Sequence, residues 1–155
     1  MVVRDMRRRD RALPHRDALE LLRRAEYGVL SSVGPDGQPY GVPLSFCLLD
    51  NAIYFHCAPE GQKVDNIDGN ARVSFCVVGD TEVLPDQFAI RYASVIAFGT
   101  AVEVFEADKQ RALEGLLSKY SAGFIESGVN YIEKHFAHVR VFRVQIESLS
   151  GKARP

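Results

Sequence analysis

The segment YGVLSSVGPDGQPYGVPLSFCLLDNAIYFHCAP, residues 27–59, contains three apolar runs separated by two tight turns. The first turn is Gly34-Pro35-Asp36-Gly37 and the second is Asp50-Asn51, and both combinations are typical of chain reversal. Because such short turns connect neighbouring antiparallel strands, the three runs are predicted to form a meander of hairpins. The predicted strands cover residues 27–33, 39–49 and 52–58.

The second half of the chain is predicted to add further strands to this sheet. Residues 71–78 form a run rich in Val, Phe and Cys, and residues 138–149 form a closing apolar strand before a Gly151-Lys152 tail. The long apolar region 88–105 contains Gly99, which indicates either two strands or one strand bent by a bulge where a barrel turns a corner.

Helices are predicted from capping residues and from the helical spacing of apolar side chains. The first begins at Pro14 and ends near Gly28, and a short second helix opens after Gly61. Asp108 is predicted to be the N-cap of a third helix, and residues 126–136 are predicted to form a weaker fourth. The apolar face of the third helix consists of Ala112, Leu113, Leu116, Leu117 and Tyr120.

The connections between the strands define the fold class. A parallel doubly wound sheet needs a helix between successive strands, whereas here hairpins or short segments such as the predicted polar loop 80–87 join most of them. The sequence therefore predicts a mainly β, α+β fold, an antiparallel barrel with flanking helices. At 155 residues the chain is predicted to be a single domain, 1–155, with a basic N-terminal arm at 1–13.

Composition argues against several classes of function. The chain is 46% apolar and 25% charged with a net charge of -1, so it has no overall attraction to nucleic acid. No apolar run is long enough to span a bilayer, and the basic N-terminus lacks the apolar core of a secretory signal. The cysteines Cys47, Cys57 and Cys76 form no CxxC pair and are predicted to be reduced thiols in a cytoplasmic protein.

The basic arm has two interpretations. Its arginines stand at positions 4, 7, 8, 9 and 11. A solvated arm that docks on the domain or on a partner subunit is favoured, because the acidic balance of the rest of the chain opposes a nucleic-acid-binding arm.

The segment 53–63, IYFHCAPEGQK, is the strongest candidate for chemistry. It is predicted to be a strand that runs into a Pro/Gly break and then opens a helix, with Gly61 in the break and Lys63 in the first helical turn. Backbone N–H groups at a helix start, together with a lysine, can bind an anion such as phosphate. A bound anion would also remove the conflict between Lys63 and the positive end of the helix dipole. A structural role explains His56, at the strand end, about as well as a functional one.

A proline inside a predicted strand marks a second unusual place. Pro43, in the run Val42-Pro43-Leu44-Ser45-Phe46, cannot donate a hydrogen bond to a neighbouring strand. Its strand is therefore predicted to lie at an edge, to be bulged, or to face something other than a strand; an ordinary edge and a flat ligand explain it equally well. No GxSxG, Walker or GxGxxG motif occurs, and the histidines lack metal-ligand spacing, so no metal site is predicted.

Taken together, these segments resemble the pyridoxamine 5'-phosphate oxidase-like FMN-binding split barrels, and within them the nitroimidazole-resistance type of flavoprotein. The resemblance covers nearly the whole chain, in order. It rests on RR at 7–8 with DR at 10–11, PYGVPLSF at 39–46, IYFH at 53–56 with EGQK at 60–63, YASVI at 92–96 with FG at 98–99, and SGK at 150–152.

The resemblance implies a homodimer that binds two FMN molecules at the subunit interface. In the family, the strand matching 42–46 lines the isoalloxazine, and the segment matching 56–63 holds the ribityl phosphate with Lys63 as its cation. His56 would lie close to flavin and substrate as the one catalytic candidate, a proton donor to a reduced substrate. The implied cofactor-binding residues are Val42, Pro43, Leu44, Ser45, His56, Cys57, Gly61, Lys63 and Ser94, the last approaching from near the interface.

The function implied is an FMN-dependent oxidoreductase that passes electrons from a reduced nicotinamide or another donor to a small organic acceptor. A nitroaromatic is the family's example, and no nucleic-acid or membrane partner is expected. Residues 139–144, VRVFRV, lack the arginine-rich substrate-phosphate signature of the oxidases proper, which argues against vitamin B6 oxidation. Cys57 and Ala58 stand where the oxidases proper often have hydroxyl residues that contact the cofactor phosphate. Backbone N–H groups and Lys63 would therefore provide more of the phosphate binding here. The alternative is a non-catalytic flavin- or haem-binding module.

Overall fold

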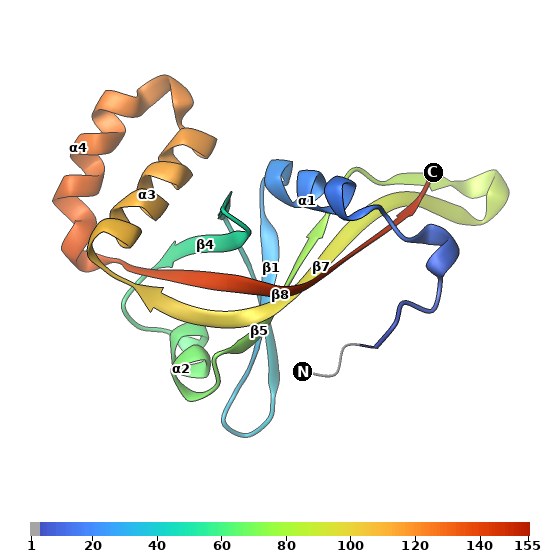
Figure 1. Ribbon diagram of the computed structural model, residues 1–155, viewed down its shortest axis with the longest axis horizontal. Coiled ribbons are helices and arrows are strands. Elements are labelled where there is room, and N and C mark those ends of the chain that lie inside the picture. Colours follow the sequence, from blue (N-terminus) through green and yellow to red (C-terminus); the bar gives the residue numbers. More distant parts are fainter. Residues whose placement is uncertain (1–3) are drawn as a thin grey trace.

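Both predicted hairpins form in the computed structural model, which describes residues 4–155 (Figure 1). β1 (Gly28–Val33) pairs with β2 (Pro39–Leu44), and β3 (Cys47–Leu49) pairs with β4 (Ala52–Cys57). Both pairs are antiparallel. The turn signals therefore predicted the local connections correctly.

The prediction of one continuous strand over residues 39–49 is wrong, because the chain leaves the sheet at Ser45 and Phe46. Phe46 is fully buried and packs edge-on against Phe75, with ring centroids 4.7 Å apart. Its backbone N–H donates to the hydroxyl of Tyr120 (3.0 Å) rather than to a strand. The break separates β2 from β3, which lie at opposite ends of the strand order, so the predicted meander is also wrong.

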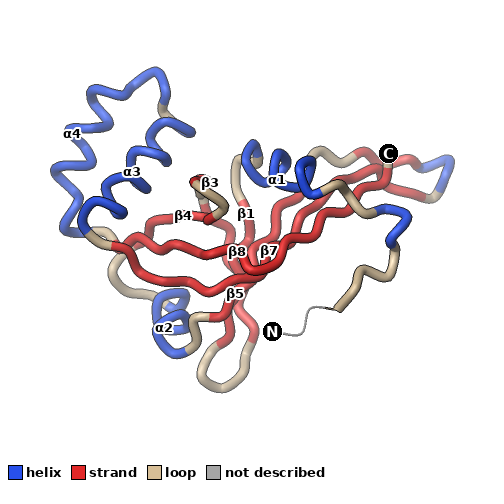
Figure 2. The backbone as a smooth tube through the Cα atoms, viewed as in Figure 1, coloured by secondary structure: helices blue, strands red, loops and turns tan. Residues whose placement is uncertain are grey.

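The strands form one antiparallel sheet in the order β2-β1-β5-β7-β8-β4-β3, with β6 paired to β7. The two terminal strands, β2 and β3, follow each other in the chain, so the sheet curls into a barrel that is open along one side (Figure 2). This confirms the predicted antiparallel split barrel with flanking helices. The remaining strands are β5 (Arg72–Val78), β6 (Glu82–Leu84), β7 (Ala89–Val104) and β8 (Arg140–Arg154).

β7 and β8 pair along almost their whole length. The region 88–105 is thus one bent strand, and the pairing shifts between Phe98 and Gly99. A side chain at Gly99 would overlap the carbonyl oxygen of Gln145, so only glycine fits this crossing. The prediction that Gly151-Lys152 forms a tail is wrong, because both residues belong to β8 and pair with β7.

β6 and a helical turn at Pro85–Gln87 occupy much of the predicted polar loop 80–87. The loop prediction failed because three strand residues are too few to show an alternating pattern. β6 pairs with β7 and forms an arm that points away from the helices α3 and α4 (Figure 1). Phe88, near the tip of this arm, is 98% exposed.

All four predicted helices form, and they are α1 (His15–Arg24), α2 (Gln62–Gly69), α3 (Glu106–Tyr120) and α4 (Ile125–His135). The prediction of Asp108 as an N-cap is wrong, because α3 begins at Glu106 and Phe105 occupies the cap position. Asp108 instead accepts a hydrogen bond from the hydroxyl of Tyr54 (3.3 Å). This contact ties the first turn of α3 to β4.

Two apolar clusters stabilise the molecule. The larger one fills the barrel, where α1 and α2 pack against the sheet, and its buried rings are Phe46, Phe55, Phe75 and Phe142. The smaller one lies between α3, α4 and the outer face of the sheet, and it includes Cys47, Tyr54, Val104, Ala112, Leu116 and Ile132. β4 contributes to both clusters, one from each face.

The last part of the predicted basic arm, from the helical turn Arg9–Arg11 to Leu13, contacts the end of β8, whereas residues 1–3 fall outside the described part of the chain. Leu13 donates a backbone hydrogen bond to the carbonyl of Gly151 (2.9 Å). Two ion pairs within the arm are Arg8–Asp10 and Arg9–Asp5. The arm is therefore partly neutralised and attached to its own domain. Among residues 4–155, no helix has the length and apolar character that crossing a membrane requires; a cytoplasmic location stays a prediction.

Candidate functional site

β4 carries His56 at the point where the strand leaves the barrel. Side chains alternate across a strand, so Phe55 and Cys57 point into the barrel and His56 points outward. Phe55 is fully buried and Cys57 is 8% exposed, whereas His56 is exposed. His56 is therefore the residue of this strand end that reaches solvent.

The predicted Pro/Gly break and short helix follow directly. Gly61 has φ 132°, a conformation that side chains rarely adopt, and no atom lies within 4 Å of the place where a Cβ would stand. The first helical hydrogen bonds of α2 run from the amides of Val64 and Asp65 to the Gly61 carbonyl (2.8 and 3.1 Å). The amides just before them, those of Gln62 and Lys63, have no intrahelical acceptor. The loop thus combines open space with N–H donors.

Lys63 gives this loop a positive charge that reaches β4. His56 reaches solvent, but the protein around its ring removes part of its hydration; this partial desolvation lowers the pKa of His56, and the charge of Lys63 lowers it further. Burial raises the pKa of the Cys57 thiol, and Lys63 opposes that rise. No ion pair of Lys63 occurs within residues 4–155. The loop 57–63 therefore has an uncompensated cation beside helix-start amides, which suits an anion.

The other cation near the loop is already paired. Arg140, opposite Cys57 on β8, contacts Asp68 of α2 (3.1 Å) and Glu103 of β7 (2.6 Å). These carboxylates hold the guanidinium in its charged form and raise its pKa. Arg140 therefore fastens α2 to the sheet, and Lys63 remains the cation with charge to offer a ligand.

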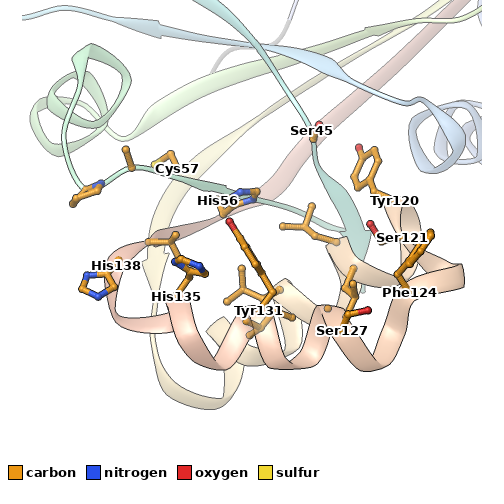
Figure 3. Close-up of a pocket in the computed structure, with 18 residues that line it drawn as sticks. Ser45, His56, Cys57, Tyr120, Ser121, Phe124, Ser127, Tyr131, His135 and His138 are labelled. Atoms are coloured by element: carbon orange, nitrogen blue, oxygen red, sulfur yellow. The ribbon is translucent and has the colours of Figure 1, made fainter.

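A groove of about 910 Å³ opens on the outer side of β4, between the strand end and the α3–α4 pair (Figure 3). His56 lies on one wall, and Tyr131 and His135 of α4 lie opposite (Figure 3). Its floor is apolar, with side chains from both helices. The lining residues are Ser45, His56, Cys57, Ala58, Pro59, Leu113, Leu116, Leu117, Tyr120, Ser121, Phe124, Ser127, Gly128, Tyr131, Ile132, His135, His138 and Val139.

Ser45, the first residue of the strand break, lies at the upper end of this groove (Figure 3). Lys119 of α3 donates to the Phe46 carbonyl (2.9 Å), and its ammonium lies 3.9 Å from the centre of the Phe46 ring. The hydroxyl of Tyr120, at the same end of α3, accepts the hydrogen bond from the backbone N–H of Phe46. The end of α3 therefore fixes the break and holds exposed Ser45 on the groove side.

The residues predicted from the sequence fall into four places, of which Ser94 is the most distant. Ser45, His56 and Cys57 meet at the groove, and Gly61 with Lys63 follows at its end. The alternation of β2 turns Val42 and Leu44 toward the barrel core and leaves Pro43 exposed. β2 is an edge strand, which is one of the three alternatives that Pro43 left open. The cofactor roles of these residues stay predictions.

Ser94 does not join the other candidates within one chain. His56 pairs with Val141, which pairs with Val104 of β7, and Ser94 lies 10 residues earlier on that strand. At about 3.3 Å per residue, roughly 33 Å of strand separates the two positions. A cofactor that contacts both Lys63 and Ser94 would need Ser94 from a second copy.

Sequence reasoning missed the α4 side of the groove. Tyr131 and His135 lie one turn apart, and their rings are stacked at a tilt with centroids 4.3 Å apart. The available signal was an aromatic pair at i, i+4 on the helix predicted at 126–136. Among residues 4–155, no cluster of three His, Cys, Asp or Glu side chains could hold a metal ion.

Comparison with known proteins adds a family and a fold. The family model described as pyridoxamine 5'-phosphate oxidase matches residues 14–153. A candidate 5-nitroimidazole antibiotic resistance protein of Bacteroides thetaiotaomicron is 19% identical with a TM-score of 0.80, covering 92% of this chain and 86% of that chain. An FAD-binding protein of Mesorhizobium loti is 24% identical with a TM-score of 0.67, covering 94% and 98%.

A third structure, an FAD and haem binding protein of Mycobacterium smegmatis, is 19% identical with a TM-score of 0.78 and covers 92% of this chain and 73% of that chain. No curated protein matches the sequence. At these identities the structural matches establish the split-barrel fold, and the match over residues 14–153 establishes the family.

Proposed function

Because this chain belongs to the pyridoxamine 5'-phosphate oxidase family, we propose that it binds FMN and acts as an oxidoreductase on a small organic acceptor. The observation that carries the proposal is the loop at the end of β4. There, the open space at Gly61 and the amides at the start of α2 stand next in the chain to Lys63, which has no ion pair within residues 4–155 and whose charge acts on His56 and Cys57. These groups fit a terminal phosphate, which prefers helix-start amides and a cation.

The proposed cofactor extends from this loop along the outside of the barrel toward the strand break. The exposed residues Pro43 and Ser45 stand on that side, and Pro43 leaves a strand edge without a donor. Cys57 contributes through its backbone, because its side chain is buried in the core. A bound flavin supplies two-electron transfer from a donor such as a reduced nicotinamide to an acceptor.

His56 is the proposed proton-donating residue. Its lowered pKa makes the neutral imidazole the main form at neutral pH, and neutral imidazole still carries one N–H. Its position, between the loop and the groove, allows that N–H to reach an acceptor held in the groove. The neutral form would hold the acceptor by a hydrogen bond, and proton transfer during reduction would come from the imidazolium form, which is the minor form at neutral pH and is regenerated from solvent.

Oxidation of a phosphorylated vitamin B6 compound is not proposed. Arg140 and Arg143, the cations of the segment 139–144, are each paired with carboxylates, Arg143 with Asp108 at 3.5 Å. A second phosphate would therefore have to break existing ion pairs. This agrees with the missing arginine-rich pattern in the sequence.

The proposed active form is a homodimer. The β6–β7 arm exposes apolar side chains, with Phe88, Val83 and Ile90 at 98%, 68% and 50% exposure. A surface of this kind is typical of an interaction site. A second copy packed along the arm would supply Ser94 to the loop of its neighbour, which one chain cannot do.

The first test is a visible absorption spectrum of the purified protein together with thermal unfolding in the presence of FMN or FAD. Yellow protein and a larger rise in melting temperature with FMN than with FAD are expected. Colourless protein with no stabilisation by either flavin would remove the proposal. A larger stabilisation by FAD than by FMN would support a flavoprotein but would show that its cofactor is FAD and not FMN.

A non-catalytic flavin- or haem-binding module is the second candidate. The observation in its favour is a large apolar groove with His56, His135 and His138 along it, since histidines are common haem ligands. The lining holds no Lys or Arg to pair with the propionates of haem. A Soret band after haem addition would favour this candidate, and FMN binding without turnover by any reductant would favour storage.

A further inference from the structure

We infer that Asn66 and Arg140 are positioning residues for the anion loop, residues 57–63, because together they fix the place and rotation of α2, whose start carries the loop's N–H donors. The inference deepens the proposed function and rests on it for one point, namely that the anion is the phosphate of FMN. Neither residue lines the groove, and neither is a proposed cofactor contact.

α2 is too short to hold its own position. It has 8 residues, about two turns, and a helix of this length is not stable by itself in water. Its apolar contacts come from Val64 and Ile67, which are buried in the barrel core. Such contacts are not directional, whereas hydrogen bonds from the amides of Gln62 and Lys63 to an anion weaken steeply when their geometry is poor. An anion loop here therefore needs directional contacts that fix α2.

The first directional contact lies on the core side of α2. The side-chain amide of Asn66 donates to the hydroxyl of Ser32 on β1 (3.0 Å), and the two residues are 2% and 3% exposed. They are the two buried polar residues among residues 4–155, and each is the partner of the other. A buried amide and hydroxyl lose their hydration, so their bond adds little stability beyond what apolar side chains would give. What the bond adds is direction, one helical turn after the free amides of Gln62 and Lys63.

The second directional contact lies at the other end of α2. Arg140 donates to both carboxylate oxygens of Asp68, at 3.2 and 3.1 Å, and to Glu103 of β7 at 2.6 Å. A two-pronged contact between a guanidinium and a carboxylate fixes orientation as well as distance. Arg140 also stands opposite Cys57, the residue at which the anion loop leaves β4. The last turn of α2 is thus joined to the strand position where the loop begins.

The two contacts together define the geometry of the loop. The bond between Asn66 and Ser32 fixes the rotation of α2 against β1, and the bonds of Arg140 fix the end of α2 against β7 and β8. Both ends of the loop are then held, one by β4 and the other by α2. Loss of either contact should leave the fold in place and misalign the N–H donors from the phosphate, since misplacements of about 1 Å are costly at such sites.

The test compares FMN with riboflavin, which lacks the phosphate, by fluorescence titration. Asn66→Leu keeps the number of side-chain heavy atoms and removes the hydrogen bond. It should weaken FMN binding about tenfold and change riboflavin binding less than about twofold. Arg140→Lys keeps the charge and loses the two-pronged contact, so it should weaken FMN binding about threefold. Circular dichroism checks that each variant is folded, and Arg140→Lys decides alone if Asn66→Leu does not fold.

Val77→Ala is the matched control, because Val77 is buried in the barrel core on β5 and contributes to stability only. It should lower the melting temperature and leave the ratio of the two affinities unchanged. An unchanged ratio in Asn66→Leu and Arg140→Lys would overturn the inference. Equal losses of FMN and riboflavin affinity would also overturn it, because the two residues would then be structural without positioning the loop.

A second readout needs no flavin and separates this inference from the proposed function. Thermal unfolding in sodium phosphate, against sodium chloride of equal ionic strength, should show a larger rise in melting temperature for the unchanged protein than for Lys63→Ala. Asn66→Leu should respond like Lys63→Ala, which retains the general stabilisation by phosphate. This pattern in a protein that takes no flavin would reject the FMN proposal and keep the positioning role. A preference for FMN over riboflavin that both variants retain would do the reverse, and the absence of both responses in the unchanged protein would reject both.

Discussion

The two faces of β4 place neighbouring residues in opposite environments. On the inner face, Ile53, Phe55 and Cys57 are sealed in the barrel core. On the outer face, Tyr54 is buried against α3 while His56, two residues further, opens into the groove. Because side chains alternate along a strand, residues that stabilise the core and residues that can contact a ligand occupy adjacent positions of the same segment. Substitutions one residue apart should therefore have opposite consequences.

The largest expected effect belongs to the inner face. Phe55 is fully buried and stacks on Phe142 with ring centroids 5.5 Å apart. Phe55→Ala would leave a cavity in the barrel, so the free energy of unfolding should fall by about 3–5 kcal/mol. Urea-induced unfolding followed by circular dichroism measures this loss.

The control for Phe55→Ala is the same truncation on the groove side. Phe124 is 72% exposed, so Phe124→Ala should change the free energy of unfolding by about 0.5 kcal/mol or less. If the two truncations cost the same, the inner face of β4 is not the stabilising face and the comparison fails.

The next largest effect belongs to His56. His56→Ala should lower the rate of acceptor reduction about 100-fold, because general acid catalysis contributes at least this factor. The free energy of unfolding and the amount of bound flavin should stay close to those of the unchanged protein. Stopped-flow reduction under saturating acceptor separates the rate from binding.

His15→Ala serves as the control for a histidine outside the site, since His15 is exposed at the start of α1. Its rate should not change. Equal losses of rate and of flavin content in His56→Ala would make His56 a cofactor ligand without a role in proton transfer.

A smaller effect is expected at Lys63, where the anion loop continues the outer face. Lys63→Ala should weaken FMN binding about tenfold, the order expected for one charge-assisted hydrogen bond. Riboflavin, which lacks the phosphate, should bind both proteins equally. Fluorescence titration measures both affinities.

Lys134→Ala is the matched control, because Lys134 is exposed on α4 and lies outside the groove lining. Its affinity for FMN should be unchanged. An unchanged affinity in Lys63→Ala as well would remove Lys63 from the phosphate role and would leave the loop amides as the proposed site.

The parts that the sequence predicted well are those in which cause and effect are close in the chain. The hairpin turns at 34–37 and 50–51 act locally, and so does the strand, glycine and helix order of 53–63. The face of His56 follows from strand alternation alone. These features needed no knowledge of the rest of the molecule.

The parts that the sequence did not predict depend on distant contacts. The strand break at Phe46 is stabilised by Tyr120, 74 positions away, and by Lys119 beside it. The groove exists only because α4 folds back so that Tyr131 faces His56. No local pattern at Phe46 or His56 indicates these contacts, and the aromatic residues of the two helices would be equally acceptable on a solvated helix.

The smallest expected effect is a pH dependence of the free energy of unfolding, which tests how far His56 on the outer face of β4 is dehydrated. In an unfolded chain His56 has a pKa of 6.5, and burial, followed by the charge of Lys63, lowers it in the folded protein. Between the two pKa values the unfolded chain binds a proton that the folded chain does not, so the free energy of unfolding falls as the pH falls. The stabilisation is complete above pH 6.5 and is lost below it.

Two variants isolate this contribution. His56→Gln removes the titrating group, and Lys63→Ala raises the pKa of His56 in the folded protein, because the repulsive charge is absent. The loss of stability between pH 7 and pH 5, measured by urea unfolding, should therefore be largest in the unchanged protein, smaller in Lys63→Ala and smallest in His56→Gln. Equal losses in all three would mean that the imidazole is as well solvated in the fold as in the unfolded chain. His56 on the outer face of β4 would then be fully hydrated, and a ligand in the groove would meet no partly dehydrated imidazole there.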